Sequence, residues 1–441
     1  MPEVTRVLER KIDAKLVEWQ KRKKRKCLIL QGARQVGKTY SIRLFGTDRY
    51  KEMLEINFKE NPSAAEIFSG DLTVDTIITS MRFRFPDKKI LPGKTLIFLD
   101  EIQECEEAVT ALKFFSQDGR FDVIASGSML GIDYKRASSY PVGYVEHEKM
   151  RGLDFEEYLW SRGIRQDLIQ SVKECYDRMV SVPEAIHTQM MGYLREYIAL
   201  GGMPEVVQSF ADTDDYRVAD RIQRDILTGY QYDIAHYATA EEKVKAEKCF
   251  LSLGRQLLGK ENRKFQYKEV EHGGRAQKYY SSIEWLLRAD LIQLCRLTTD
   301  VRYDPEDYAR NDFFRAYTTD LSLLVAMRDF SLKQQIIENT ISGTTKGGIY
   351  ECVVADIFLK KEKEMFFYKN DSAQKEIDFL IQTDGMVVPV EVKSGNTRAT
   401  SLKWLKKRCP DISRMIKLAD GNTGKSEEGI VTLPLYMAMF L

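Results

Sequence analysis

A short apolar stretch that runs directly into a GxxxxGKT sequence constrains this chain more than any other feature. The apolar stretch is 27–30, and the loop reads Gly32-Ala33-Arg34-Gln35-Val36-Gly37-Lys38-Thr39. Glycines in such a loop let backbone N–H groups turn toward one anion, the lysine reaches the outer phosphates, and the hydroxyl can hold Mg²⁺. The pattern predicts a nucleoside-triphosphate site over residues 32–40, ending at Tyr40, with Lys38 as a catalytic residue and Thr39 as a magnesium ligand. A glycine-rich turn without a ligand is the alternative interpretation.

Two adjacent carboxylates supply the second half of such a site. Residues 95–99 have the pattern of a buried strand, and Asp100 and Glu101 follow it directly. We expect Asp100 to hold Mg²⁺ through water and Glu101 to orient and deprotonate the attacking water. Acids at a helix N-terminus are the alternative, because the helix dipole also favours them there.

Hydroxyl groups end the next apolar stretch, 121–126. Ser126 or Ser128 could place a polar side chain against the γ-phosphate, and a plain turn is the alternative; Ser128 is the catalytic candidate. Phosphoryl transfer also favours an arginine near the transferred group. Arg120, Arg136 and Arg151 are candidates, and the sequence does not choose between them.

The composition excludes several classes of protein. A chain of 441 residues exceeds the size at which single cores stop growing, so we expect about two to four domains. The formal net charge of +1 gives no overall attraction to nucleic acid or membrane. Seven cysteines without a C-x-x-C spacing and four histidines argue against structural zinc and a disulfide framework. With no signal-peptide pattern and no long apolar run, we expect a cytoplasmic protein.

The order of patterns along the chain predicts an α/β multidomain fold. Four apolar stretches alternate with helical patterns, which indicates a parallel sheet flanked by helices: 53–58, 95–99, 121–126 and 143–148. Residues 151–250 have helical patterns throughout, and the order of helix, short element, helix and strand between 250 and 300 fits a winged helix. Residues 345–441 predict one helix and then three closely spaced strands. The predicted domains are a P-loop core, a helical lid or connector, a winged helix and a final α/β domain, over 1–150, 151–240, 241–335 and 336–441.

A second group of charged residues lies in a predicted hairpin near the C-terminus. Asp384-Gly385 has the pattern of a two-residue turn, so Thr383 should face Met386. That register places Asp378 opposite Glu391, and Glu376 opposite Lys393, with all four side chains on one face.

Opposed carboxylates repel each other unless they share a cation. A divalent metal held by Asp378, Glu391 and Glu351, with Lys393 as a catalytic residue, would suit phosphodiester cleavage. The alternative is a surface hairpin in which Glu376 and Lys393 form a modest ion pair.

Motifs distributed over nearly the whole chain resemble those of one family. They lie at 32–39, 99–103, 127–128, 153–159, 197–205, 285–291, 346–351, 376–379 and 390–393. The chain resembles the prokaryotic AAA-type P-loop ATPases whose C-terminal domain of unknown function is related to PD-(D/E)XK nucleases. The resemblance implies binding and hydrolysis of ATP with Mg²⁺ on an AAA-like sheet with helices on both faces, a winged helix in the middle, and a restriction-endonuclease-like domain at the end. Members often carry a Gly-Arg pair where this chain has Gly143-Tyr144, so an arginine role there is in doubt.

Two basic segments could contact nucleic acid. Residues 255–288 contain eight Lys and Arg against four Glu, and Arg275, Lys278 and Arg288 fall in the candidate recognition helix; packing against protein is the alternative. Residues 21–26 are all basic, and they either contact phosphates or form a solvated entry to the first strand.

Three functions remain open from the sequence. The first is an ATPase that couples hydrolysis to a winged-helix and nuclease-like module acting on DNA. The second is an ATP-dependent regulatory switch that binds protein partners or a further copy of the chain, with an inactive nuclease-like domain. The third is a scaffold with vestigial sites.

Overall fold

The computed structural model describes residues 8–127, 141–239, 241–259, 263–302, 304–370, 372–383, 385–395, 397–425 and 429–441. The chain divides into two compact units. The first comprises 9–151 with 288–290, and the second comprises 152–287 with 291–441. The division after Arg151 lies close to the predicted boundary at residue 150.

A five-stranded sheet forms the centre of the first unit, and all of its strand pairs are parallel. The strand order is β2-β3-β4-β1-β5, with bounds Glu52–Asn57, Thr95–Asp100, Asp122–Gly127, Cys27–Gln31 and Val145–Lys149. β3 and β4 are buried over their whole length, whereas the edge strands β2 and β5 are only partly buried. Continuous apolar runs therefore mark the inner strands, as expected for a sheet covered on both faces. The predicted parallel sheet is confirmed.

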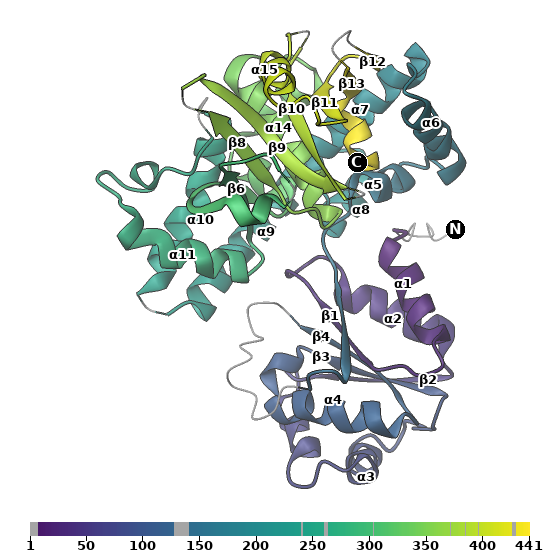
Figure 1. Cartoon of the computed structure of the whole chain (residues 1–441). Coiled ribbons are helices and arrows are strands. Elements are labelled where there is room, and N and C mark those ends of the chain that lie inside the picture. The colour runs from purple at the N-terminus through teal and green to yellow at the C-terminus, as the bar shows by residue number, and fades with distance from the viewer. Residues whose placement is uncertain are drawn as a thin grey trace. The chain divides into compact units, whose positions relative to one another are not determined.

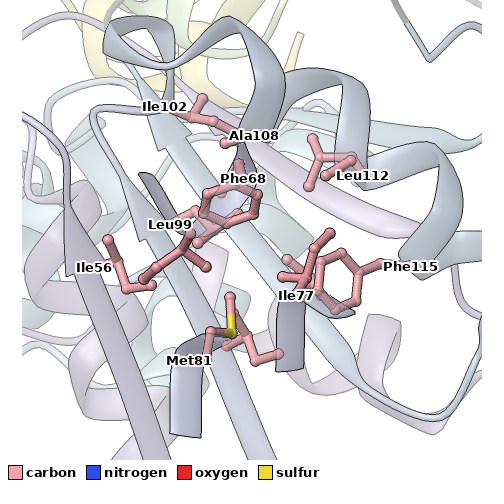
Figure 2. Close-up of a cluster of buried hydrophobic side chains, with 14 of the residues drawn as sticks. Ile56, Phe68, Ile77, Met81, Leu99, Ile102, Ala108, Leu112 and Phe115 are labelled. Carbon is pink, nitrogen blue, oxygen red and sulfur yellow. The ribbon is translucent and has the colours of Figure 1, made fainter. Parts of the chain in front are cut away.

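Helices cover both faces of this sheet (Figure 1). They are α1 (Lys11–Lys21), α2 (Lys38–Arg49), α3 (Val74–Arg84) and α4 (Glu106–Asp118). Figure 2 shows the core on the α3 and α4 side, where Ile56 and Leu99 of the strands meet Ile77, Met81 and Phe115 of the helices. On the other face α2 packs so closely that a Cβ on Gly46 would lie 3.1 Å from the Leu96 side chain.

The second unit begins with helices and continues into a large mixed sheet. The first helices are α5 (Phe155–Ser161), α6 (Gln166–Arg178), α7 (Glu184–Leu200), α8 (Pro204–Thr213), α9 (Tyr216–Tyr237) and α10 (Glu242–Leu258). These bounds agree with the helical pattern predicted for 151–250. Later helices are α11 (Ala276–Arg288), α12 (Leu321–Ala326), α13 (Phe330–Ile337), α14 (Gly343–Lys360) and α15 (Thr400–Arg408).

The mixed sheet has eight strands in the order β12-β13-β11-β10-β9-β8-β6-β7. Their bounds in chain order are β6 Ile292–Thr298, β7 Ala309–Thr318, β8 Phe366–Asn370, β9 Lys375–Thr383, β10 Met386–Val392, β11 Met415–Ala419, β12 Gly424–Lys425 and β13 Ile430–Pro434. α14 contacts β10 and β7, and α15 contacts β9 and β10.

The segment that predicted a winged helix does not form a separate sheet. α10, α11 and the antiparallel hairpin β6–β7 follow the expected order, but β6 also pairs in parallel with β8. The hairpin is therefore part of the same sheet as β8–β13. The predicted domain boundary at 335 falls between β6 and β8, which are hydrogen-bonded to each other. The pattern of a short strand pair does not reveal a third partner from a later part of the chain.

The register of the β9–β10 hairpin is the predicted one, with Thr383 opposite Met386, although Asp384 lies outside the described residues. The predicted alternation of faces is wrong beyond this ladder. β9 carries one extra residue opposite β8 between the pairs Phe366–Leu380 and Tyr368–Ile377. Such a bulge reverses which residues share a face. Accordingly, Ile377 packs with Leu380 in the core beneath α15, while Phe379 packs against Phe358 of α14.

Within the described ranges, no helix combines the length and apolar character that a membrane crossing requires.

Candidate nucleotide site

The GxxxxGKT loop connects the end of β1 to the start of α2, as the sequence predicts. Gly37 has a φ of 96° and Gln35 a φ of 62°, so the loop turns through left-handed backbone conformations before α2 begins at Lys38. Ala33 and Val36 are buried, whereas Arg34 is half-buried and Gln35 is exposed. Tyr40 lies on α2 and is 56% exposed.

Gly32 is required by the strand that lies beside the loop. Met150 directly follows β5, and a Cβ at position 32 would lie 2.1 Å from its carbonyl oxygen. The Met150 N–H also donates to the Gln31 carbonyl at 2.7 Å. Because backbone atoms cannot give way as a flexible side chain can, the start of the loop accepts no larger residue.

Lys38 is buried, and its side chain is hydrogen-bonded to the start of the loop. Its Nζ donates to the carbonyls of Gly32 and Ala33, at 2.9 and 2.8 Å. Burial lowers the pKa of Lys38 to about 8, and the carboxylates of Glu101 and Asp100 oppose this shift. The ammonium group is therefore still mostly protonated at neutral pH.

Asp100, at the end of β3, is 3% exposed and faces the loop. Its carboxylate accepts hydrogen bonds from Thr39 Oγ1 at 3.2 Å, from Asn57 Nδ2 at 3.1 Å, from the Glu101 N–H at 3.1 Å and from the Ser126 hydroxyl. Burial raises the pKa of Asp100, and the hydrogen bonds from Ser126 and Thr39 counteract the rise. A hydroxyl and a carboxylate in contact are the oxygen donors that Mg²⁺ prefers, so Thr39 and Asp100 fit this ion.

Asn57 is a site residue that the sequence analysis missed. It ends β2 and pairs with Asp100 in the β2–β3 ladder. Its Oδ1 accepts from the N–H groups of Lys59 and Glu60, both at 3.0 Å, and this directs Nδ2 toward Asp100. The sequence contains a signal for Asn57, because it is a polar residue at the end of an apolar strand pattern. The carboxyl ends of parallel strands meet at one edge of the sheet, so such a residue is expected near Asp100.

Glu101 has a left-handed backbone with a φ of 51°. This conformation costs a residue other than glycine roughly 1–2 kcal/mol. The half-buried carboxylate accepts from Gln103 Nε2 and interacts electrostatically with Lys38. A strained backbone at the residue that carries this carboxylate is consistent with its predicted role as a base.

The other predicted participants are distributed differently. Ser126 contacts Asp100, and Ser128 and Arg136 lie outside the described residues. Arg120 precedes β4, at the end of the sheet opposite to the loop, and pairs with Asp75 and Asp118.

Arg151 belongs to the support of the loop. It pairs with Asp290 at 3.1 Å, and its carbonyl accepts from Arg10 Nη2 at 2.7 Å. Arg10 Nη1 then donates to the Val36 carbonyl at 3.1 Å, so these residues fix the outside of the loop. Arg10 was not predicted from the sequence, because nothing in its local pattern distinguishes it from other basic residues.

The predicted carboxylate cluster of the second unit is arranged around an arginine. Arg315 of β7 is 2% exposed. Its Nη1 lies 2.7 Å from Glu351 Oε1 and 3.8 Å from Asp378 Oδ1, and Nη2 contacts Glu376. Arg263 Nη1 lies 2.9 Å from the other oxygen of Glu351. The guanidinium groups supply the positive charge for which the sequence analysis invoked a metal.

Glu391 and Lys393 also pair differently from the prediction. Lys393 Nζ lies 2.7 Å from Glu391 Oε1, and Glu391 Oε2 accepts from the Leu402 N–H at 3.3 Å. Asp378 accepts from the Val392 N–H at 2.8 Å, and burial together with Glu351 raises its pKa to about 7. Across the described ranges, no three His, Cys, Asp or Glu residues are grouped so that they could hold a metal ion. The predicted metal site of Glu351, Asp378 and Glu391 is therefore not formed, because Arg315 lies between the first two and Glu391 turns toward α15.

Three family models match separate parts of the chain. An AAA domain matches 24–159, and domains of unknown function, DUF8612 and DUF4143, match 191–334 and 346–437. Together with the parallel sheet and the loop, the first match identifies 24–159 as a P-loop domain of the AAA type. The other two matches carry no stated function. No curated protein matches the chain.

Solved structures with partial similarity to the chain include an Orc1 protein and a Cdc6p protein. The Orc1 protein of Aeropyrum pernix in complex with DNA is 11% identical, with 77% of this chain and 97% of that chain covered and a TM-score of 0.29. Cdc6p of Pyrobaculum aerophilum is 14% identical, with 78% and 98% covered and a TM-score of 0.25. TM-scores this low do not establish a common overall fold, so the assignment rests on the AAA domain match and on the site itself.

Proposed function

We propose that the first unit binds ATP with Mg²⁺ and hydrolyses it. The observation that carries the proposal is the contact between Thr39 Oγ1 and Asp100 at 3.2 Å, which joins the phosphate loop to the end of β3. The AAA domain match supports ATP as the nucleotide.

Each residue of the site has a part in this function. The backbone N–H groups of the loop and the Lys38 ammonium would bind the phosphates, and Thr39 and Asp100 would hold Mg²⁺. When bound, Mg²⁺ supplies positive charge that stabilises the phosphates during transfer. Glu101 accepts the proton of the attacking water, while Asn57 and Ser126 fix the orientation of Asp100.

Steady-state ATP hydrolysis tests the proposal. We expect Glu101→Gln to lower turnover by about 10²–10⁴-fold, the usual contribution of a general base, and Lys38→Ala to abolish it. Glu104→Gln, an exposed acid three residues further on, is the matched control and should retain the wild-type rate. Wild-type turnover in both Lys38→Ala and Glu101→Gln would refute the proposal.

For the second unit, we infer a regulatory or binding role rather than nucleic-acid cleavage. The contacts of Arg315 with Glu351, Glu376 and Asp378 favour this alternative, because they replace a cation with a fixed guanidinium. We expect no cleavage of plasmid DNA or single-stranded RNA in Mg²⁺ or Mn²⁺. Cleavage that Glu391→Ala and Lys393→Ala both abolish would contradict the inference.

A further inference from the structure

Basic residues are concentrated around α15 of the second unit. Between residues 391 and 420 the chain has eight Lys and Arg against three Asp and Glu, although its formal net charge is only +1. Between 393 and 408 there are six basic residues and no acid: Lys393, Arg398, Lys403, Lys406, Lys407 and Arg408. The remainder of the chain is therefore net acidic, and the basic character is local.

Packing of α15 directs part of this charge to the surface. Leu402 and Leu405 are fully buried in the core that also contains Ile377 and Met415. Figure 1 shows α15 lying over the sheet beside β10. Lys403 and Lys407 are four residues apart, so they lie on one face of the helix, and Lys407 is exposed. Arg398, just before the helix, is also exposed.

Lys393 pairs with Glu391 at 2.7 Å, but two other cations of this surface are not neutralised in this way. Within the described part of the chain, Arg398 and Lys407 have no acidic partner, and Arg408 lies over the Trp404 ring at 5.7 Å. The candidate recognition helix α11 differs in this respect. Lys278 and Lys248 both pair with Glu271. Arg263 pairs with Glu351, which lies outside 255–288, so the local positive excess predicted for that segment is partly offset.

We propose that α15 and the preceding Arg398 form a surface that binds the phosphate backbone of nucleic acid. A row of phosphates needs only positive charge and matching spacing, which this surface supplies. Trp404, which is half-buried and lies 6.4 Å from Tyr368 with Arg408 above it, adds an aromatic flank among the cations.

Two other polyanionic partners fit the surface less well. A helix that binds a membrane inserts its apolar face into the lipid, but the apolar face of α15 is already buried against the sheet. Stable protein partners need exposed apolar or aromatic anchors at the centre of the interface, whereas the outward positions of α15 are Thr400, Lys403 and Lys407. DNA and RNA share the required chemistry, and the experiment distinguishes them.

Fluorescence anisotropy of the full chain tests the proposal without nucleotide, so its outcome is independent of the proposed ATP hydrolysis. The probes are labelled duplex DNA, single-stranded DNA and single-stranded RNA of one sequence, titrated over a range of salt concentrations. The test variant is Arg398→Gln/Lys407→Gln. The control is Lys89→Gln/Lys94→Gln, which removes the same charge from exposed positions just before β3.

We expect the wild type to bind at least one of the probes, and the test variant to bind more weakly. Its plot of log affinity against log salt should be shallower by about 2, roughly one for each lost cation. The control should match the wild type. The proposal is overturned if the wild type binds none of the probes at low salt, if the test variant keeps the wild-type affinity and slope, or if polyglutamate or anionic lipid vesicles bind more tightly than nucleic acid. A thermal unfolding midpoint and a circular dichroism spectrum equal to those of the wild type establish that the variant is folded.

Discussion

Replacement of Arg315 by methionine should destabilise the second unit substantially. The guanidinium is 2% exposed, and its Nη1 lies 2.7 Å from Glu351 Oε1 and 3.8 Å from Asp378 Oδ1. At an effective dielectric constant of about 20, unit charges at these two separations have Coulomb energies of about 6 and about 4 kcal/mol, before the cost of removing the charges from water. Measured losses on breaking a buried pair are about 3–5 kcal/mol. Because Arg263 still neutralises one oxygen of Glu351, we expect about 3 kcal/mol.

Urea unfolding followed by tryptophan fluorescence measures this loss. Three of the four tryptophans, Trp160, Trp285 and Trp404, belong to the second unit and report its transition. The double variant Arg315→Met/Glu351→Met removes both charges and should recover part of the stability. A loss of stability below about 1 kcal/mol in Arg315→Met would refute the assignment of Arg315 as the counter-ion of these carboxylates. Tighter binding of Mn²⁺ by the wild type than by Arg315→Met would refute it as well.

Three further predictions concern the nucleotide site. Gly32→Ala should abolish ATP binding in calorimetry, because its Cβ would lie 2.1 Å from the Met150 carbonyl oxygen; wild-type affinity would contradict this packing. Asn57→Ala should lower the apparent affinity for Mg²⁺ in ATP turnover by about 10–100-fold, as loss of a group that orients a metal ligand commonly does, and an unchanged Mg²⁺ dependence would exclude the role. ATP affinity should fall as pH rises through about 8, where Lys38 loses its proton. Because the pKa of Lys38 is lower in the folded state, the unfolded state binds more protons between about pH 8 and the unperturbed value of 10.5, so the free energy of unfolding should rise with pH in this range. ATP affinity that rises with pH in calorimetry, or an unfolding free energy that falls with pH in urea, would contradict this.

The elements that depend on local pattern could be predicted from the sequence. Continuous apolar runs identified β3 and β4, and helical spacing identified α5–α10, because burial on both faces or on one stripe leaves a direct periodic signal. The turn pattern of the sequence at Asp384-Gly385 predicted the β9–β10 register, which the pairing of Thr383 with Met386 confirms. In the site, the loop and Asp100 were found because the loop follows one apolar strand pattern and Asp100 ends another.

Features that depend on distant partners could not be predicted. Asn57 meets Asp100 through strand order, and Arg10 reaches Val36 through the packing of α1. Arg315 lies 36 residues before Glu351, and nothing in the local pattern of β7 shows that its side chain is buried among carboxylates. The bulge in β9 likewise arises from pairing with β8, so the alternation of the sequence alone gave the wrong faces for Ile377 and Phe379.

Calorimetric titration of ATP into the full chain, with Mg²⁺ and with EDTA, tests the central claim most directly. The account predicts that the wild type binds one ATP per chain, that Mg²⁺ tightens binding, and that Lys38→Ala loses it. An absence of binding by the wild type, or equal binding by Lys38→Ala, would show that the loop at residues 32–39 and the carboxylates at 100–101 do not form a nucleotide site.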